Sequence, residues 1–185
     1  MPRDIILVRH AQSQANAEGR LANKTWDPPL TPVGRQQAHT LIKQFDHIEI
    51  AGIASSPMLR AQQTIDPLAQ SRGLSIDIVP LLAEVDLGRW DGQLLDDIAV
   101  KEPDLFHAWR KDPDSSPPPG GEGLLTVGRR VLHALAEYAA TQKDGLIVAA
   151  THADCIKGAA LVVMDVPGAA ASHVMVANIG QILLR

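Results

Sequence analysis

Cationic and titratable side chains stand at the points where apolar segments of this sequence end. Arg9 and His10 directly follow the apolar run 5–8, and His152 follows a second apolar run, 146–150. An arginine presents a planar fork of N–H donors that matches the oxygens of a phosphate, and a neutral imidazole can act as a nucleophile. The adjacent Arg9 and His10 therefore indicate chemistry on a phosphoryl group.

A second arginine, Arg60, lies in the segment SSPMLRAQQT. Ser56 is expected to cap a helix there and Pro57 to be its first residue, which places Arg60 in or near the first turn. The N-terminus of a helix carries unpaired N–H groups and the positive end of the helix dipole, and both favour an anion. This segment therefore adds a second phosphate-binding group. Glu84 follows a further predicted strand and supplies a carboxyl group.

Alternating strand and helix patterns predict the elements that position these residues. Apolar runs bounded by turn residues recur with helical periodicity between them, which is typical of βαβ units and a mostly parallel sheet. We expect strands over 5–8, 50–54, 75–79 and 146–150, and edge strands over 173–177 and 181–184. Helices are expected to start near Thr31, Ser56 and Asp154, and a longer helix is lined by Val127, Val131, Leu135 and Tyr138. The predicted fold class is α/β, a three-layer α/β/α arrangement with helices on both faces of the sheet.

Helical and strand periodicity fade between residues 84 and 123, where DPDSSPPPGGEG is the most obvious loop. We expect a helical and loop excursion over the active-site edge of the sheet, not a second domain, so residues 1–185 form one domain. Ligands of open α/β sheets bind at the carboxyl ends of the strands. The fold would thus bring one set of side chains to a single rim: Arg9, His10, Arg60, Glu84 and His152.

The composition excludes several classes of partner. The net charge of −4 and pI near 5.9 leave no basic stripe for nucleic acid or for an anionic membrane. The run 5–8 is too short for a signal peptide, and the apolar region 146–164 is interrupted by charged residues, so no membrane span is expected. These features favour a cytoplasmic protein. Cys155, the one cysteine, is expected to be a small buried core residue.

Five motifs, in order, resemble those of the histidine phosphatase superfamily, which includes the cofactor-dependent phosphoglycerate mutases. LVRHAQSQAN is similar to the family's segment around its nucleophilic histidine, and PLTPVGRQQA to the start of its next helix. SSPMLRAQQT resembles the segment with the phosphate-binding arginine, EVDLGRWDG the segment with the acidic residue, and THADCIK the segment with the second histidine. The resemblance covers nearly the whole chain, and five ordered motifs are far more specific than one.

The resemblance implies a role for each matched residue. His10 would be the nucleophile that forms a phosphohistidine, and Glu84 would protonate the leaving alkoxide. The phosphate would be held by Arg9, Asn16, Arg60 and His152. The catalytic set is then His10, Glu84, Arg9, Arg60 and His152. We expect a phosphomonoester phosphatase that needs no metal ion and no cofactor, because the arginines supply the positive charge that Mg²⁺ supplies in other phosphoryl-transfer sites.

The charges of this set predict the protonation states of His10 and Glu84. Arg9 and Arg60 should lower the pKa of His10 and keep its imidazole neutral. The arginines alone should also lower the pKa of Glu84, and a bound phosphate dianion should raise it, which would couple its protonation to the arrival of substrate.

Other residues are weaker candidates. Taken singly, Arg60 and Glu84 would be ordinary solvated charges, and Asp154 is expected to be a helix cap. Possible substrate contacts are Arg20, Lys24, Trp26, Arg89 and Trp90, with Trp109 and Arg110 at the pocket mouth, although a solvated loop residue or a buried indole is the simpler interpretation of each. The chain departs from the family pattern at Ala11, where glycine is usual, and at Gly123, where serine is usual.

Two alternative functions stay open. A phosphoglycerate mutase would use the same phosphohistidine, but mutases of this family are generally longer, and 185 residues leave little chain to exclude water from the site. A catalytically idle module that binds phosphorylated ligands would be expected to have lost His10, Arg60 or Glu84. Hydrolysis of a small phosphorylated metabolite is therefore favoured. The segment 173–185 could also pair across the axis of a homodimer.

Overall fold

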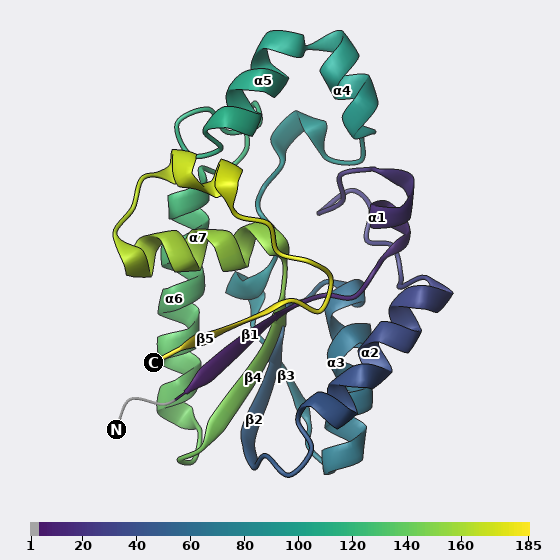
Figure 1. Ribbon diagram of the computed structural model, residues 1–185, viewed down its shortest axis with the longest axis vertical. Coiled ribbons are helices and arrows are strands. Elements are labelled where there is room, and N and C mark those ends of the chain that lie inside the picture. The colour runs from purple at the N-terminus through teal and green to yellow at the C-terminus, as the bar shows by residue number, and fades with distance from the viewer. Residues whose placement is uncertain (1–3) are drawn as a thin grey trace.

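A five-stranded sheet lies at the centre of residues 4–185, the part of the chain that the computed structural model describes (Figure 1). The strands are β1 (Ile5–Arg9), β2 (Ile50–Ser55), β3 (Ile76–Ile78), β4 (Leu146–Thr151) and β5 (Gln181–Leu184). Their order is β3-β2-β4-β1-β5, with β5 antiparallel to β1 and the other pairs parallel. The mostly parallel α/β sheet predicted from the sequence is confirmed.

Helices cover both faces of this sheet, α2 and α3 on one and α6 and α7 on the other (Figure 1). The α-helices are α1 (Gln14–Glu18), α2 (Pro32–Gln44), α3 (Leu59–Arg72), α4 (Leu95–Lys101), α5 (Pro103–Lys111), α6 (Leu124–Thr141) and α7 (Ala153–Met164). Short 3₁₀ helices are η1 (Pro80–Leu82), η2 (Gly88–Trp90) and η3 (Gly168–His173). The predicted three-layer arrangement is therefore correct.

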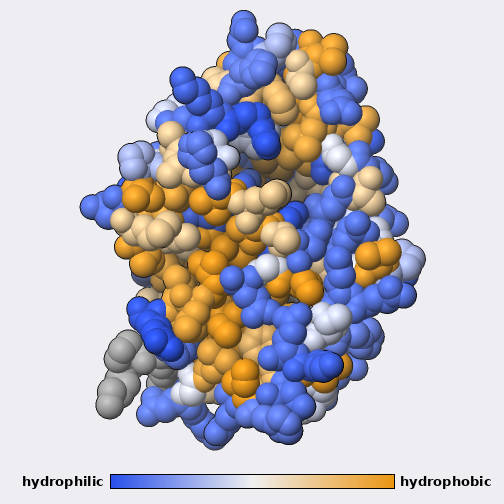
Figure 2. Space-filling model, viewed as in Figure 1, coloured by the Kyte–Doolittle hydropathy of each residue, from blue (hydrophilic) through white to orange (hydrophobic). Residues whose placement is uncertain are grey.

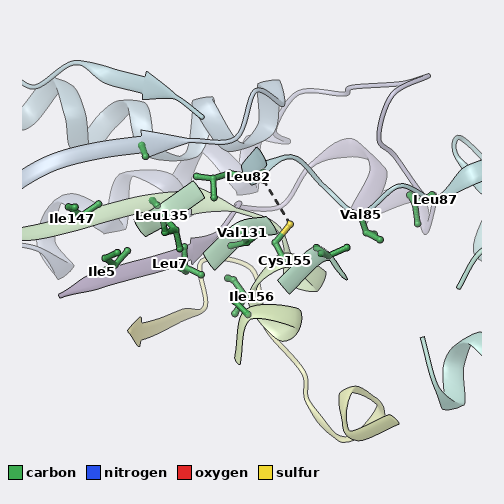
Figure 3. Packing of buried hydrophobic residues seen from close by; sticks show 14 residues of the cluster. Ile5, Leu7, Leu82, Val85, Leu87, Val131, Leu135, Ile147, Cys155 and Ile156 are labelled. Atoms are coloured by element: carbon green, nitrogen blue, oxygen red, sulfur yellow. Dashed lines mark hydrogen bonds between the residues drawn. The ribbon is translucent and has the colours of Figure 1, made fainter. Parts of the chain in front are cut away.

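The strands alternate between two apolar cores because successive side chains point to opposite faces. Leu7 packs with Val131 and Ile156 beneath α6 and α7, as Figure 3 shows, whereas Val8 packs with residues of α2 and α3. Cys155 belongs to the first of these cores, as expected, and burial raises its pKa to about 12. Burial on both faces fixes the register of the central strands, and with it the positions of the residues that follow them.

The two helices on one face begin in different ways. Thr31 caps α2 with its side chain and Pro32 is the first helical residue, as predicted. The cap predicted for the next helix is wrong: α3 begins at Leu59, and its first N–H group is bonded to Oδ2 of Asp27, 2.7 Å away. The hydroxyl of Ser56 instead accepts a hydrogen bond from the N–H of Met58 and lies 2.8 Å from Nε2 of His152.

The edge strand predicted over 173–177 is also wrong. His173 is the last residue of η3 and residues 174–177 follow it as irregular chain, in which the carbonyl oxygen of Val176 accepts a hydrogen bond from the Arg9 side chain, 2.6 Å away, instead of one from a neighbouring strand. The strand over 181–184 is present as β5, and the strand expected over 75–79 is shortened to β3.

The segment between η1 and α6 rises above the carboxyl ends of the strands and carries α4 and α5 (Figure 1). It pairs with the loop that follows β1, because Arg20 and Leu94 form an isolated bridge and the Leu21 N–H bonds to the Gln93 oxygen at 2.9 Å. The predicted excursion is therefore anchored to the segment that follows α1. Within residues 4–185, no helix has the length and apolar character to span a membrane.

Candidate active site

His10 lies immediately after β1, and its hydrogen-bond partners define which ring nitrogen carries no hydrogen. The residue is 3% exposed, and its Nδ1 lies 2.8 Å from the carbonyl oxygen of Ala11. A carbonyl oxygen can only accept, so Nδ1 carries the hydrogen and Nε2 is unprotonated, with its lone pair 3.3 Å from the Nε donor of Arg60. Nε2 is thus the nitrogen that can attack an electrophile.

The pKa of His10 is lowered to about 3, mainly by burial and next by the charge of Arg60, with a smaller contribution from Arg9. The imidazole is therefore neutral at neutral pH. The direction expected from the sequence is confirmed, although burial is a larger cause than either arginine.

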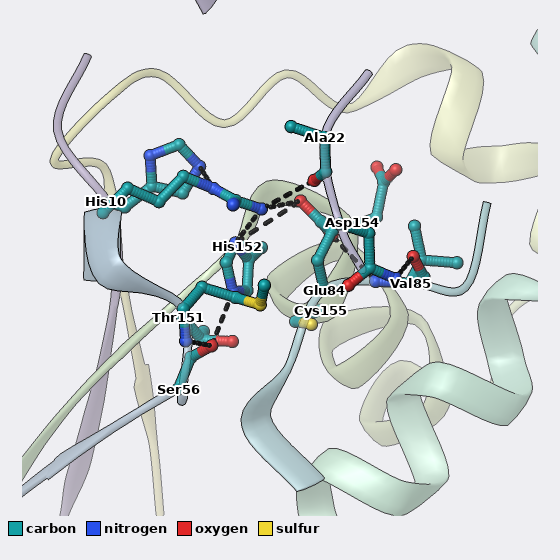
Figure 4. Close-up of polar contacts among 12 residues, drawn as sticks. His10, Ala22, Ser56, Glu84, Val85, Thr151, His152, Asp154 and Cys155 are labelled. Atoms are coloured by element: carbon teal, nitrogen blue, oxygen red, sulfur yellow. Dashed lines mark hydrogen bonds and ion pairs between the residues drawn. The ribbon is translucent and has the colours of Figure 1, made fainter. Parts of the chain in front are cut away.

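Figure 4 shows His10, Ala22, Glu84 and His152 around one space, and the guanidinium of Arg60 contacts all four. Its Nε lies 3.3 Å from Nε2 of His10, and its Nη2 lies 2.9 Å from the Ala22 oxygen and 3.2 Å from Nδ1 of His152. The side chain is 2% exposed, and its Nη1 forms an ion pair with Asp27 at 3.2 Å. Asp27 thus holds both this guanidinium and the first N–H of the helix that carries it.

His152 follows β4 and occupies the N-cap position of α7. Its Nε2 lies 2.8 Å from Oγ of Ser56, and because Arg60 can only donate, Nδ1 accepts from it. Burial and the charge of Arg60 keep the pKa of His152 well below its usual value. The start of α7 is fixed by close packing on α6, since a Cβ at Gly128 would lie 2.2 Å from the Gly158 oxygen.

Arg9 projects into the same site from the end of β1. Its Nη1 donates to the Val176 oxygen, and its buried Nε has no hydrogen-bond partner among the described residues. An unpaired buried donor is costly, and an anionic ligand would satisfy it. Burial lowers the pKa of Arg9, although Glu84 and Asp154 oppose this shift.

Glu84 follows η1, and its carboxyl group faces the guanidinium of Arg60 and the imidazole of His152. Its Oε2 lies 3.4 Å from Nδ1 of His152 and 3.8 Å from Nη2 of Arg60. Burial, with Asp154 as the second cause, raises the pKa of Glu84 to about 7, against the opposing effects of Arg60 and Arg9. The expected lowering without phosphate is therefore wrong, because desolvation outweighs the arginines.

A second arginine, Arg130 of α6, holds the backbone that carries Glu84. It donates to the oxygens of Leu81, Ala83 and Glu84 at 2.6, 2.9 and 3.0 Å, and pairs with Glu122 at 3.0 Å. This clamp was not predicted, because its carbonyl partners have no sequence signature.

These residues surround a pocket of about 170 Å³. Figure 2 shows the molecular surface hollowed between the α4–α5 excursion and the body of the protein. Its lining includes five of the six residues predicted for catalysis and phosphate binding, namely Arg9, His10, Asn16, Arg60 and Glu84, while His152, the sixth, is buried beneath it in contact with Arg60. The Oδ1 atom of Asn16 accepts from Ser13 N and Asn178 Nδ2, which fixes its amide at the pocket wall.

The weaker candidates are placed less favourably. Arg20 lines the pocket with its guanidinium stacked over Trp26. Lys24 pairs with Asp86 at 2.6 Å, and Arg89 pairs with Glu102. Lys24, Trp26 and Arg89 are absent from the pocket lining.

The proposed substrate contact of Trp90 is wrong. Its indole is 0% exposed, packs against Trp109 and donates to Glu102, so it belongs to the core of the excursion. Asp154 is not a helix cap either: it is the second residue of α7, lines the pocket and pairs with Lys157 at 3.4 Å.

The nitrogen and oxygen atoms of His10, Glu84 and His152 lie within 4.8 Å of one another, a spacing that could suit a metal ion. However, the Arg60 guanidinium contacts all three residues. A second cation there would be repelled by this fixed charge, whereas an anion would be attracted. The donor set therefore fits an oxyanion better than a metal ion.

Comparison with known proteins gives concordant matches. Residues 5–185 match the family model of the histidine phosphatase superfamily (branch 1). Phosphoserine phosphatase 1 of Hydrogenobacter thermophilus is 32% identical over 148 residues, which are 80% of this chain and 70% of that protein. A probable phosphoglycerate mutase of Yersinia pestis is 32% identical over 135 residues, 71% of this chain, but the match spans only 60% of that protein.

A solved structure also matches the whole chain. The mycobacterial glucosyl-3-phosphoglycerate phosphatase, in complex with VO3, superposes with a TM-score of 0.89 and 26% identity, over 100% of this chain and 93% of that one.

Proposed function

This chain belongs to the histidine phosphatase superfamily, and we propose that it hydrolyses small phosphomonoesters through a phosphohistidine at His10, without a metal ion. One observation carries the proposal: His10 presents an unprotonated Nε2 to Arg60, and Glu84, with a pKa of about 7, faces the same guanidinium. A nucleophile and a proton donor thus share one anion-binding group.

In the first step, Nε2 of His10 attacks phosphorus and the bond from phosphorus to the ester oxygen breaks. The proton of Glu84 passes to the leaving alkoxide, which departs as an alcohol. In the second step, Glu84 as a carboxylate takes a proton from water, whose oxygen attacks phosphorus. The P–N bond breaks, its electron pair returns to Nε2, and inorganic phosphate leaves.

The phosphoryl oxygens are held by charged and neutral donors. Arg60 lines the pocket with its positive charge, and Arg9 contributes the buried Nε that has no hydrogen-bond partner among the described residues. Arginine bonds to phosphate oxygens are charge-assisted and can be bidentate. The amide of Asn16 completes the donor set that we assign to phosphate binding, and the buried ring of His152 acts through Arg60, from which its Nδ1 accepts.

The mutase alternative is the weaker one. A phosphatase is named in the match that covers 70% of the relative's length and in the superposed structure, whereas the mutase match spans 60% of the relative. The idle binding module is disfavoured because His10, Arg60 and Glu84 are all present. Phosphoserine and glucosyl-3-phosphoglycerate, named for two of the relatives, are small phosphorylated molecules, and we place the substrate in this class.

The test is hydrolysis of p-nitrophenyl phosphate in excess EDTA by the native protein and by His10→Ala. His133→Ala is the matched control, since His133 is exposed on α6 and paired only with Glu137. Turnover by the native protein and the control, with none by His10→Ala, is expected. Rapid quenching without acid should trap a phosphoenzyme in the native protein and in the control but not in His10→Ala, because a phosphohistidine is labile to acid. Full activity of a folded His10→Ala protein would remove the nucleophile.

Three expectations stay predictions: that residues 1–185 form one catalytic domain, that the protein acts in the cytoplasm without a nucleic-acid partner, and that it forms a homodimer.

A further inference from the structure

A second, larger pocket of about 470 Å³ adjoins the catalytic one. The two share Arg9, Ala153 and Asp154 in their linings. The second pocket extends between the end of α5, the first turns of α7 and the irregular chain after η3. The second pocket therefore offers space next to Arg9 for the alcohol portion of an ester whose phosphate contacts Arg9.

The charges around the second pocket are mostly positive. Arg110 and Lys157 line it together with His173, and Asp154 is the one carboxylate in its lining. Asp154 pairs with Lys157 at 3.4 Å. Arg110 is exposed and forms no ion pair or hydrogen bond within the described residues; its guanidinium lies 5.8 Å from the ring centre of Trp109.

The acidic residues nearest to Arg110 in sequence are occupied elsewhere. Asp112 accepts from the N–H groups of Asp114 and Ser115, both at 3.1 Å, and Asp114 accepts from Leu125 N at 2.8 Å. Neither carboxylate lines the pocket. The charge of Arg110 is therefore available to a ligand.

Most of the remaining wall is apolar or aromatic, with Ser172 as an exception. Trp109, Pro113, Val174 and Met175 line the pocket, and Met175 is 93% exposed. An indole, a proline ring and a thioether suit a carbon framework better than a hydrated ion. The pocket thus combines an apolar wall with an uncommitted cation.

We propose that this second pocket binds the alcohol portion of the substrate and that Arg110 recognises an oxyanion, such as a carboxylate, on that portion. The inference rests on the proposed phosphatase function, since it assigns a substrate class to the same site. Trp109 would contact the carbon framework, and the Asp154–Lys157 pair would separate the two anions of the substrate.

The test compares two esters of nearly equal size, 4-carboxyphenyl phosphate and its neutral amide analogue, 4-carbamoylphenyl phosphate. The amide withdraws electrons more strongly and makes the better leaving group, so any preference for the carboxylate opposes that trend. We expect the native protein to prefer the carboxylate in kcat/KM by roughly tenfold, the size of one partly exposed charge-assisted contact. The ratio should fall towards one in Arg110→Gln, and high salt should reduce it in the native protein.

Arg129→Gln is the matched control, because Arg129 is an exposed arginine of α6 outside both pockets. It should keep the native ratio. Equal hydrolysis of the two esters by the native protein, or an unchanged ratio in Arg110→Gln, would refute the role of Arg110 while leaving the phosphatase function intact. Hydrolysis of neither ester would overturn the proposed function, and the role of this pocket with it.

Discussion

The protonation of Glu84 should control the hydrolysis of poor leaving groups. Its pKa of about 7 in the ligand-free protein means that the protonated fraction falls to about one tenth at pH 8 and about one hundredth at pH 9. For an alkyl phosphate such as ethyl phosphate, kcat/KM should therefore fall about tenfold per pH unit above pH 7. Because the pKa of His10 is about 3, the nucleophile stays neutral throughout this range and adds no second slope.

The same carboxyl group should matter little when the leaving group needs no proton. p-Nitrophenyl phosphate releases a stable phenolate, so its kcat/KM should show a much smaller decline. Glu84→Gln should reduce kcat/KM for the alkyl ester by about 10²- to 10⁴-fold, and its kcat/KM should no longer fall as the pH rises above 7. A bound phosphate dianion should raise the pKa of Glu84 further, so the slope in kcat should lie at higher pH than the slope in kcat/KM.

The assay is phosphate release from both esters between pH 6 and 9, with Asp154→Asn as a second variant. Asp154 is the second cause of the raised pKa of Glu84, so removal of its charge should move the alkyl-ester slope to lower pH. An identical slope for the two esters, or a slope that persists in Glu84→Gln, would refute the assignment of Glu84 as the proton donor.

Three further predictions concern the groups that support the site. Arg130→Met removes the donors to three carbonyls and should cost about 1–3 kcal/mol in urea unfolding, while slowing alkyl-ester hydrolysis more than p-nitrophenyl phosphate hydrolysis; equal slowing of both esters would argue against a role through Glu84. Asp27→Asn removes a negative charge 3.2 Å from Arg60 and should strengthen inhibition by inorganic phosphate several-fold, because the anion no longer meets an opposing carboxylate; weaker inhibition would show instead that the carboxylate is needed to orient Arg60. Glu84 holds a proton in the folded protein that the unfolded chain releases above pH 4.5. The free energy of unfolding of the native protein should therefore fall by about 3 kcal/mol between pH 4.5 and 7 through this group. Urea unfolding should show Glu84→Gln more stable than the native protein at pH 8 but not at pH 5, and the reverse order would contradict the raised pKa.

Much of the fold could be predicted because its signals are local. The apolar run before Arg9, the Thr31–Pro32 helix start and the buried run before His152 all have recognisable patterns. The helix start near Ser56 was misplaced because its cap comes from Asp27, which is distant in sequence. The strand expected over 173–177 failed because the periodicity of side chains does not reveal that the carbonyl of Val176 bonds to a side chain.

The residues of the candidate site could be predicted from the sequence, but the burial of their side chains and its effect on their pKa values could not. Residue types at strand ends identified His10 and Glu84, but the extent of desolvation depends on packing by the whole excursion. That is why the pKa of Glu84 was assigned the wrong direction. Asp27 and Arg130 were missed because each acts on partners that adjoin it only after folding.

The position of β4 in the sheet has a consequence for how the chain reaches its native state. β4 lies between β1 and β2, which do not pair with each other, yet it begins only at Leu146. During synthesis, the N-terminal three quarters of the chain therefore lack the strand that joins their sheet. Pairing over such long sequence separations slows folding and exposes unpaired strand edges to aggregation. Growing chains should thus depend on protection by chaperones until β4 emerges from the ribosome, and a stop codon just before Leu146 should yield an insoluble product, not a weakened enzyme.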